Sequence, residues 1–215
     1  MFNCPLCDTN TDDLVFRDDR EYYLCPRCQL IFVPPEHHLS PTEEKSRYDL
    51  HRNDPDDPDY RRFLRRLLQP LAERLTAGSH GLDFGCGPGP TLSIMLEEAG
   101  HQMAIYDPFY ADNRDLLREQ YDFITATEVV EHLYRPITEL DLLWSLLRSG
   151  GYLGIMTKLS TGRDTFASWH YKRDPTHVCF FSRTTIGWLA DRWQAQLEFH
   201  GNDVILIRKT AAEQA

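Results

Sequence analysis

The sequence has no long apolar run and a deficit of positive charge, and each lack argues against a class of function. No stretch approaches the roughly 18 to 20 apolar residues of a membrane-spanning helix. The first ten residues carry neither the basic nor the apolar region of a secretion signal, so we expect a cytoplasmic protein without a membrane partner. With 33 acidic and 23 basic residues, the formal net charge is −10. This charge disfavours broad binding to nucleic acid, which depends on neutralising phosphates.

The positive charge that is present gathers in residues 60–75, in the arginines Arg61, Arg62, Arg65, Arg66 and Arg74. The leucines of this segment recur at helical spacing, which predicts an amphipathic helix with a buried leucine stripe. The simplest interpretation of the arginines is the solvated face of that helix. A local surface that binds RNA phosphates is the alternative.

Cysteine is concentrated at one end of the chain. Of six cysteines, four form two C-x2-C pairs, Cys4 with Cys7 and Cys25 with Cys28. Their separation lies within the spacing of zinc ribbons, in which two knuckles aim four thiolates at one tetrahedral Zn²⁺. Two disulfides or free thiols are the alternative, although a reducing compartment disfavours disulfides. We predict a zinc ribbon with a structural Zn²⁺ in residues 1–33.

The polar, proline-rich composition of residues 34–58 predicts a linker or lid rather than a strand. Three of its side chains, Tyr48, His51 and Asn53, are candidates for a site folded beneath it. The usual place of such residues is solvent, so this contribution is the less common outcome.

Residues 59–215 alternate between strand and helix patterns. Strands are predicted at 80–86, 101–107, 121–129, 152–157, 196–201 and 203–209, and helices at 60–75, 90–100, 136–148 and 182–194. Such alternation predicts an α/β fold with a doubly wound, Rossmann-like, mostly parallel sheet. The last two strands read as a closing antiparallel pair. The 215 residues therefore divide into one domain and a small appendage.

The first predicted strand runs into the glycine-rich turn LDFGCGPGP. Gly85, Gly87 and Gly89 would let a ligand approach the backbone closely. About twenty residues later, Asp107 ends the second strand, where an acidic residue can hold ribose hydroxyl groups. Pro90 stands where the dinucleotide fingerprint has its third glycine, so the spacing departs from that motif.

Four segments in order, LDFGCGPG, YDP, YDFITATEVVEHL and LLRSGGYLGIMT, together resemble the class I S-adenosylmethionine-dependent methyltransferases. The resemblance covers roughly residues 60–210. It implies S-adenosylmethionine as cofactor, with these binding residues: Asp83, Gly85, Cys86, Gly87, Gly89, Asp107 and Glu128. Only fourteen residues separate Asp107 from Asp122, where that family normally has a helix and a third strand. The third strand is therefore expected to be shortened or missing.

A second cluster, TEVVEHL, ends the fourth strand of that pattern. If it turns helical, Glu128, Glu131 and His132 fall on one face. Together with His177 they resemble the ligand sets of metal-dependent RNA 2′-hydroxyl methyltransferases and of ubiquinone-pathway O-methyltransferases, which implies a second, divalent metal ion at the active site. The alternative is that these residues only shape the pocket, with His177 as general base. Glu131, His132 and His177 are the candidate catalytic residues either way.

The leading hypothesis is an enzyme that methylates an oxygen of a small molecule or sugar derivative. Some natural-product sugar methyltransferases also carry an N-terminal zinc module, and the insertion around Trp169, His170 and Tyr171 would be a lid. An RNA methyltransferase is the first alternative, because rRNA guanine methyltransferases also begin with a zinc ribbon. A non-catalytic scaffold that binds a partner is the second. The methyl acceptor, the adenine-contacting residues and the oligomeric state cannot be identified from the sequence.

Overall fold

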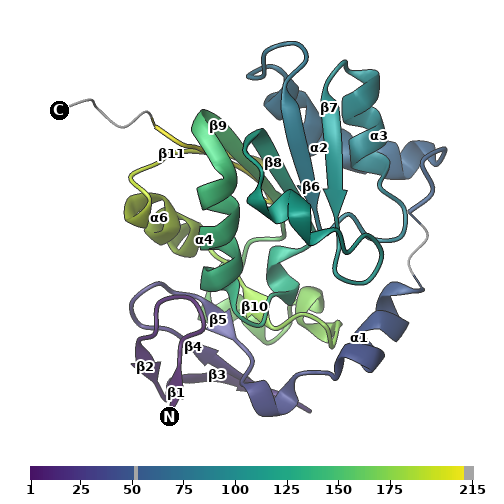
Figure 1. Ribbon diagram of the computed structural model, residues 1–215. Helices are drawn as coiled ribbons and strands as arrows, with labels where there is room; N and C mark the ends of the chain where they lie inside the picture. The colour runs from purple at the N-terminus through teal and green to yellow at the C-terminus, as the bar shows by residue number, and fades with distance from the viewer. Residues whose placement is uncertain (51–52, 211–215) are drawn as a thin grey trace.

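The centre of the computed structural model, which describes residues 1–50 and 53–210, is a six-stranded mixed sheet (Figure 1). Its strand order is β11-β12-β9-β8-β6-β7. The parallel strands are β6 (His80–Phe84), β7 (Gln102–Tyr106), β8 (Tyr121–Thr127) and β9 (Leu147–Met156). An antiparallel pair, β12 (Val204–Arg208) and β11 (Gln196–His200), completes the sheet beside β9. The predicted Rossmann-like α/β fold is confirmed.

The sheet ends at β7, without a third strand beyond it. Between β7 and β8, where every residue is described, the chain forms a bridge between Asp107 and Ala111 and the 3-10 helix η2 (Arg114–Arg118). This connection is too short for a further helix and strand. The prediction of a shortened or missing third strand is therefore confirmed.

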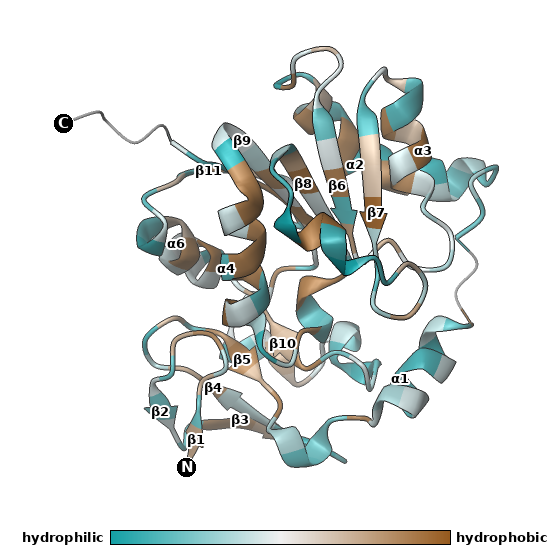
Figure 2. Ribbon diagram, in the orientation of Figure 1, coloured by the Kyte–Doolittle hydropathy of each residue, from teal (hydrophilic) through white to brown (hydrophobic). Residues whose placement is uncertain are grey.

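Helices cover both faces of the sheet (Figure 1). On one face lie α2 (Pro58–Ala72) and α3 (Thr91–Glu98), whose apolar side chains pack on Phe123 and Leu206. On the other face lie α4 (Pro136–Leu146) and α6 (Arg183–Arg192). The predicted leucine stripe is buried at Leu64, Leu67 and Leu71, and each such side chain contributes roughly 2 kcal/mol of burial. Figure 2 shows α4 brown and the outlying α1 mainly pale or teal. None of the helices within the described ranges is long and apolar enough to cross a membrane.

The cysteine-rich segment forms two small antiparallel sheets. One pairs β1 (Phe2–Asn3) with β2 (Asn10–Thr11), and the other has the order β10-β5-β4-β3. In the second sheet β3 (Leu14–Arg17), β4 (Glu21–Leu24) and β5 (Ile31–Phe32) are local, whereas β10 (Cys179–Phe180) comes from the insertion after β9. That insertion also contains α5 (Arg163–Phe166) and η4 (His170–Arg173). The predicted division at residues 33 and 58 thus separates strands that share one sheet.

The predicted linker contains two helices, η1 (Pro35–His37) and α1 (Pro41–Tyr48). A capping box between Ser40 and Glu43 begins α1, and the motif S-P-T-E is its signal in the sequence. Glu44 of α1 is buried and accepts hydrogen bonds from the hydroxyl groups of Tyr48 (2.6 Å) and Tyr134 (3.3 Å). The linker therefore packs on the methyltransferase-like domain.

Candidate active site

The carboxyl ends of the parallel strands meet at one edge of the sheet, and this edge faces α1 and the cysteine-rich sheets (Figure 1). The glycine-rich loop follows β6 and Asp107 follows β7. Glu128 follows β8, and Thr157 follows β9. Ligands of open α/β sheets bind at the carboxyl edge. The fold therefore brings the two predicted clusters to the edge where a ligand would bind.

The glycine-rich loop needs glycine at two positions for different reasons, a left-handed backbone at Gly87 and a close approach of another segment at Gly89. Gly87 has a φ of +64°, and its N–H donates to Oδ2 of Asp107 at 3.0 Å. A Cβ atom on Gly89 would lie 2.2 Å from the backbone oxygen of Asn53. The linker residue Asn53 therefore covers the loop. The sequence analysis named it as one of three candidates for a site beneath the linker. His51, the neighbouring candidate, lies outside the described residues.

Asp107 stands beside this loop with its carboxylate held in place. Oδ1 accepts from the N–H groups of Phe109 and Tyr110 at 2.8 and 3.1 Å, while Oδ2 faces Gly87. Cys86 is buried in the same loop, and burial raises the pKa of its thiol to about 12, so the group is neutral. The structure thus brings together Gly85, Cys86, Gly87, Gly89 and Asp107 at the carboxyl ends of β6 and β7.

Asp83 lies beneath the loop, within the packed layer between the sheet and α3. Its carboxylate accepts from the hydroxyl groups of Thr125 (2.7 Å) and Ser93 (3.1 Å). Burial raises the pKa of Asp83 to about 6, because a carboxylate loses hydration there. The side chain therefore ties β6 to β8 and α3, and supports the loop from below.

Replacing Asp83 with asparagine should reveal this titration. The folded pKa of about 6 exceeds the ordinary 3.8, so the wild-type free energy of unfolding falls as pH rises through this interval. Since each pKa unit corresponds to about 1.4 kcal/mol, the variant should gain roughly 3 kcal/mol on wild type between pH 4 and pH 7. Urea unfolding at both pH values measures the difference. Asp19→Asn, on an exposed turn, is the control, and a pH-independent difference for Asp83→Asn would contradict the assignment.

The second cluster does not form the α-helical face that was predicted. Glu128 has a left-handed backbone, with φ of +52°, and its N–H donates to the oxygen of Met156 at 2.7 Å. The 3-10 helix η3 (Val130–His132) follows. One ligand atom each of Glu131, His132 and His177 lies within 4.8 Å of the others, and Glu128 is outside this set. A left-handed residue and a 3-10 helix thus replace the expected α-helix, and Glu128 stays near the cluster through the Tyr171 hydroxyl, which donates to its Oε2 at 3.3 Å.

Glu131 is the fully buried centre of the cluster. Its Oε2 accepts from the Thr157 hydroxyl at 2.9 Å, and its Oε1 accepts a short hydrogen bond from the Tyr171 hydroxyl. Burial raises the pKa of Glu131, since only two hydroxyl groups and a nearby imidazole offset the lost hydration. Burial and the neighbouring Glu131 also raise the pKa of Glu128, to about 8. The site therefore holds two carboxyl groups that resist ionisation together.

The two histidines are oriented by backbone carbonyl groups. Nδ1 of His177 lies 2.7 Å from the oxygen of Tyr171, and Nδ1 of His132 lies 3.2 Å from the oxygen of Thr176. A carbonyl oxygen only accepts, so each Nδ1 carries a proton. Burial, with the neighbouring His132, lowers the pKa of His177. His177 is thus a neutral imidazole with a fixed tautomer.

Three further residues complete the site, and of these Tyr48 was one of the linker candidates from the sequence. Tyr171, expected only as part of a lid, lies with its ring centre 4.2 Å from that of His177. Thr157 was not predicted, because a lone threonine after a strand carries no signal in the sequence. Tyr48 packs edge-on against His132, with ring centres 5.4 Å apart, and against Phe109 on the cofactor side. Its place bridges the two clusters.

Comparison with known proteins identifies the family of this domain. A family model described as a methyltransferase domain matches residues 57–198. A curated relative, the ubiquinone biosynthesis O-methyltransferase of Shewanella pealeana, is 28% identical over 91 residues, which are 42% of this chain. The match spans 39% of that relative's length. The family match includes both clusters.

A solved structure shares the fold over nearly the whole chain. It is the 1,6-didemethyltoxoflavin N1-methyltransferase of Burkholderia thailandensis, with bound 1,6-didemethyltoxoflavin and S-adenosylhomocysteine. The TM-score is 0.55 at 16% identity, over 87% of this chain and 98% of the other. At this identity the likeness shows the fold alone.

Proposed function

Because the chain belongs to the class I S-adenosylmethionine-dependent methyltransferases, we propose that it methylates an oxygen of a small-molecule acceptor. The observation that carries this proposal is the buried, neutral His177. Its tautomer is fixed by the Tyr171 carbonyl, and it stands beside Glu131 at the carboxyl edge of the sheet.

The residues of the first cluster fit the cofactor. Gly87, which has no side chain and donates its N–H to Asp107, gives a nucleoside access to the loop backbone, and Asp107 is placed for ribose hydroxyl groups. When bound, S-adenosylmethionine supplies an electrophilic methyl group on a sulfonium sulfur. Asn53 and Tyr48 of the linker would cover the site and exclude water.

The residues of the second cluster supply proton transfer. Nε2 of His177 takes the proton from the acceptor hydroxyl group, which makes that oxygen a better nucleophile. The charge that forms on the imidazole is favoured by Glu131, since an adjacent carboxyl group raises the pKa of His177 against the effect of burial. Tyr171 and Thr157 hold Glu131 in this orientation.

A divalent metal ion is the second candidate for activating the acceptor. It is favoured by the three ligand atoms of Glu131, His132 and His177 within 4.8 Å, a set of two imidazoles and one carboxylate that suits several divalent ions. In that case His177 would be a ligand and not a base. Sensitivity to a chelator separates the two.

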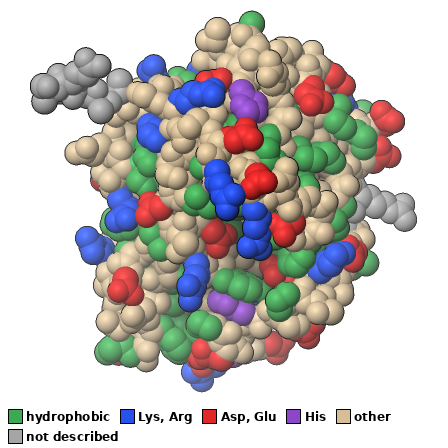
Figure 3. Space-filling model, in the orientation of Figure 1, with side chains coloured by type: hydrophobic (Ala, Val, Ile, Leu, Met, Phe, Trp, Pro, Cys, Tyr) green, Lys and Arg blue, Asp and Glu red, His purple; other side chains and the backbone are tan. Residues whose placement is uncertain are grey.

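A small acceptor is supported over RNA by the distribution of charge. Three arginines of α2 and one that follows it are paired with carboxylates: Arg61 with Glu98, Arg62 with Asp59, Arg66 with Asp203 and Arg74 with Glu198. An arginine must lose such a pairing before it can neutralise a phosphate. On the face in Figure 3, acidic and basic side chains are interspersed.

A structural Zn²⁺ in the cysteine-rich segment is the remaining part of the proposal. The Sγ atoms of Cys4 and Cys28 lie 3.6 Å apart, and those of Cys7 and Cys25 lie 3.3 Å apart. Four thiolates at 2.3 Å around a tetrahedral Zn²⁺ would be about 3.8 Å apart, so the donor set fits with little movement. All six cysteines are free thiols, which suits the predicted reducing compartment.

Labelled S-adenosylmethionine and total cell extract, separated into RNA and small-metabolite fractions, test the acceptor class. We expect label in the metabolite fraction and none with Glu131→Gln. Label in the RNA fraction would overturn the proposed acceptor.

Asp107→Ala should weaken cofactor binding by roughly 10 to 100-fold in calorimetry, as expected for lost hydrogen bonds to a charged group, while Glu131→Gln leaves it unchanged. Asp112→Ala, on the exposed surface nearby, is the control. Wild type without affinity for S-adenosylmethionine would favour the scaffold alternative.

A further inference from the structure

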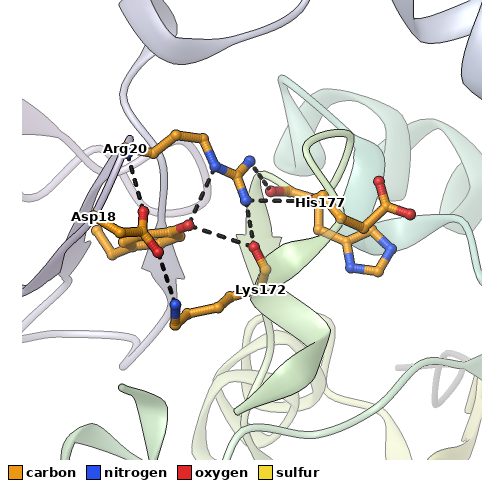
Figure 4. A network of polar contacts seen from close by, with 6 residues as sticks. Asp18, Arg20, Lys172 and His177 are labelled. Carbon is orange, nitrogen blue, oxygen red and sulfur yellow. Dashed lines mark hydrogen bonds and ion pairs between the residues drawn. The ribbon is translucent and has the colours of Figure 1, made fainter. Parts of the chain in front are cut away.

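The turn between β3 and β4 docks against the segment that carries His177 (Figure 4). The Arg20 guanidinium donates to four backbone oxygens, those of Lys172 (2.6 Å), Asp174 (3.0 Å), Pro175 (3.0 Å) and His177 (2.9 Å). One side chain of the cysteine-rich segment thus contacts four of the six carbonyl groups in residues 172–177. The last of these belongs to the proposed general base itself.

Within this stretch the Asp174 oxygen accepts from the His177 N–H at 3.2 Å, while the oxygens of Lys172 and Pro175 accept from Arg20 outside it. The stretch runs from the end of η4 to β10, and the last carbonyl groups of a helix have no partner within the helix. Unpaired buried carbonyl groups are costly, so an irregular segment needs outside donors to keep one conformation. Arginine has five N–H groups in a rigid fork, and Arg20 uses a further one on the Tyr22 hydroxyl at 3.2 Å. The fork therefore dictates the path of the segment.

Two further ties join the same parts of the chain. Nζ of the buried Lys172 lies 2.7 Å from Oδ2 of Asp18 and above the ring of Phe16. At the other end, the Val33 N–H donates to the Val178 oxygen, and the Val178 N–H donates to the Glu131 oxygen. A continuous set of hydrogen bonds therefore runs from the cysteine-rich segment to the catalytic cluster.

We propose that Arg20 is a positioning residue for methyl transfer, acting through the backbone of His177. The guanidinium fixes where the imidazole stands relative to Glu131 and the acceptor. The cysteine-rich segment is on this account a part of the active site. The inference rests on the proposed function, because it takes His177 as the base.

The competing explanation is that Arg20 only fastens the cysteine-rich segment to the core. That role would lower stability without moving His177. The test therefore needs both kinetics and an NMR signal from the His177 imidazole. Arg17 is the residue for the matched control. Arg17 lies on β3 of the same hairpin, is 63% exposed and pairs with Glu21.

The first arm compares Arg20→Gln, Arg20→Lys and Arg17→Gln by kinetics, zinc content and calorimetry with S-adenosylmethionine. Arg20→Gln should lower kcat by about 10²-fold, the loss that a displacement near 1 Å produces, with KM for the cofactor and zinc content unchanged. Arg20→Lys should recover part of kcat, because an ammonium group has donors but no fork. Arg17→Gln should match wild type. An unchanged kcat in Arg20→Gln would overturn the proposal.

The second arm follows the His177 ring by NMR of histidine-labelled protein, with His177→Asn to assign the signal. Arg20→Gln should shift this signal and Arg17→Gln should not. A lowered kcat with an unmoved His177 signal would also overturn the proposal. If Arg20→Gln loses zinc, the same two readouts on Arg20→Lys decide. A shifted signal with a fully active His177→Asn would instead sink the proposed function and leave the positioning intact.

Discussion

His177→Asn should lower kcat by roughly 10² to 10⁴-fold, the usual contribution of a positioned general base, while cofactor binding stays as in wild type. Asparagine can still donate from its amide to the Tyr171 oxygen, as Nδ1 does, so the local fold is preserved. It has no basic nitrogen to take the acceptor proton. Steady-state kinetics with calorimetry measure the two effects separately.

The matched control is His37→Asn, in η1 and away from the catalytic cluster, which should retain full activity. Chelator treatment refines the result. If wild type loses activity with chelator and recovers it with a divalent ion, His177 acts as a ligand. An unaffected wild type with an inactive His177→Asn supports the base. Turnover near the wild-type rate in His177→Asn would exclude both roles.

Cys28→Ser should remove zinc from the protein and abolish methyl transfer. A serine hydroxyl is a poor substitute for a thiolate, and the binding free energy of a structural zinc, about 10 to 16 kcal/mol in isolated fingers, is also folding free energy. Without the ion, burial raises the pKa of the Cys25 thiol to about 11, whereas a hydrogen bond with Cys28 lowers the pKa of Cys4 to about 6. Since β5 pairs with β10, the loss should spread to the segment that carries His177.

Elemental analysis and thermal unfolding check this expectation. Wild type should contain about one zinc per chain, and Cys28→Ser close to none, with a lower melting temperature. Cys86→Ser, which lies outside the four-cysteine set, should keep its zinc. Freshly purified wild type with less than half a zinc per chain would count against the ribbon.

The sheet and its helices could be predicted because their signals are periodic. The stripe of Leu64, Leu67 and Leu71 and the glycine-rich turn needed no tertiary information. The missing third strand followed from the short spacing between Asp107 and Asp122. These features depend on local sequence and on chain length, which the sequence contains directly.

The catalytic cluster depended on tertiary context and was only partly predictable. The left-handed backbone of Glu128 is stabilised by its bond to Met156, on the neighbouring strand, so no local pattern indicates it. The strands β5 and β10 have two residues each, too few for a periodic signal. Among the features that the sequence analysis did not predict, α1 is the one with a local signal, the capping box at Ser40.

The pairing of Arg20 with His177 joins positions 157 residues apart, which has a consequence for synthesis on the ribosome. At roughly 5 to 20 residues per second, the hairpin that carries Arg20 emerges about 8 to 30 s before its partner segment. Throughout that interval β5 is an open sheet edge, and such edges pair with other chains. The sheet cannot be completed until β10 has been synthesised. A nascent chain of this protein is therefore most exposed to aggregation in the interval between the synthesis of β5 and the synthesis of β10.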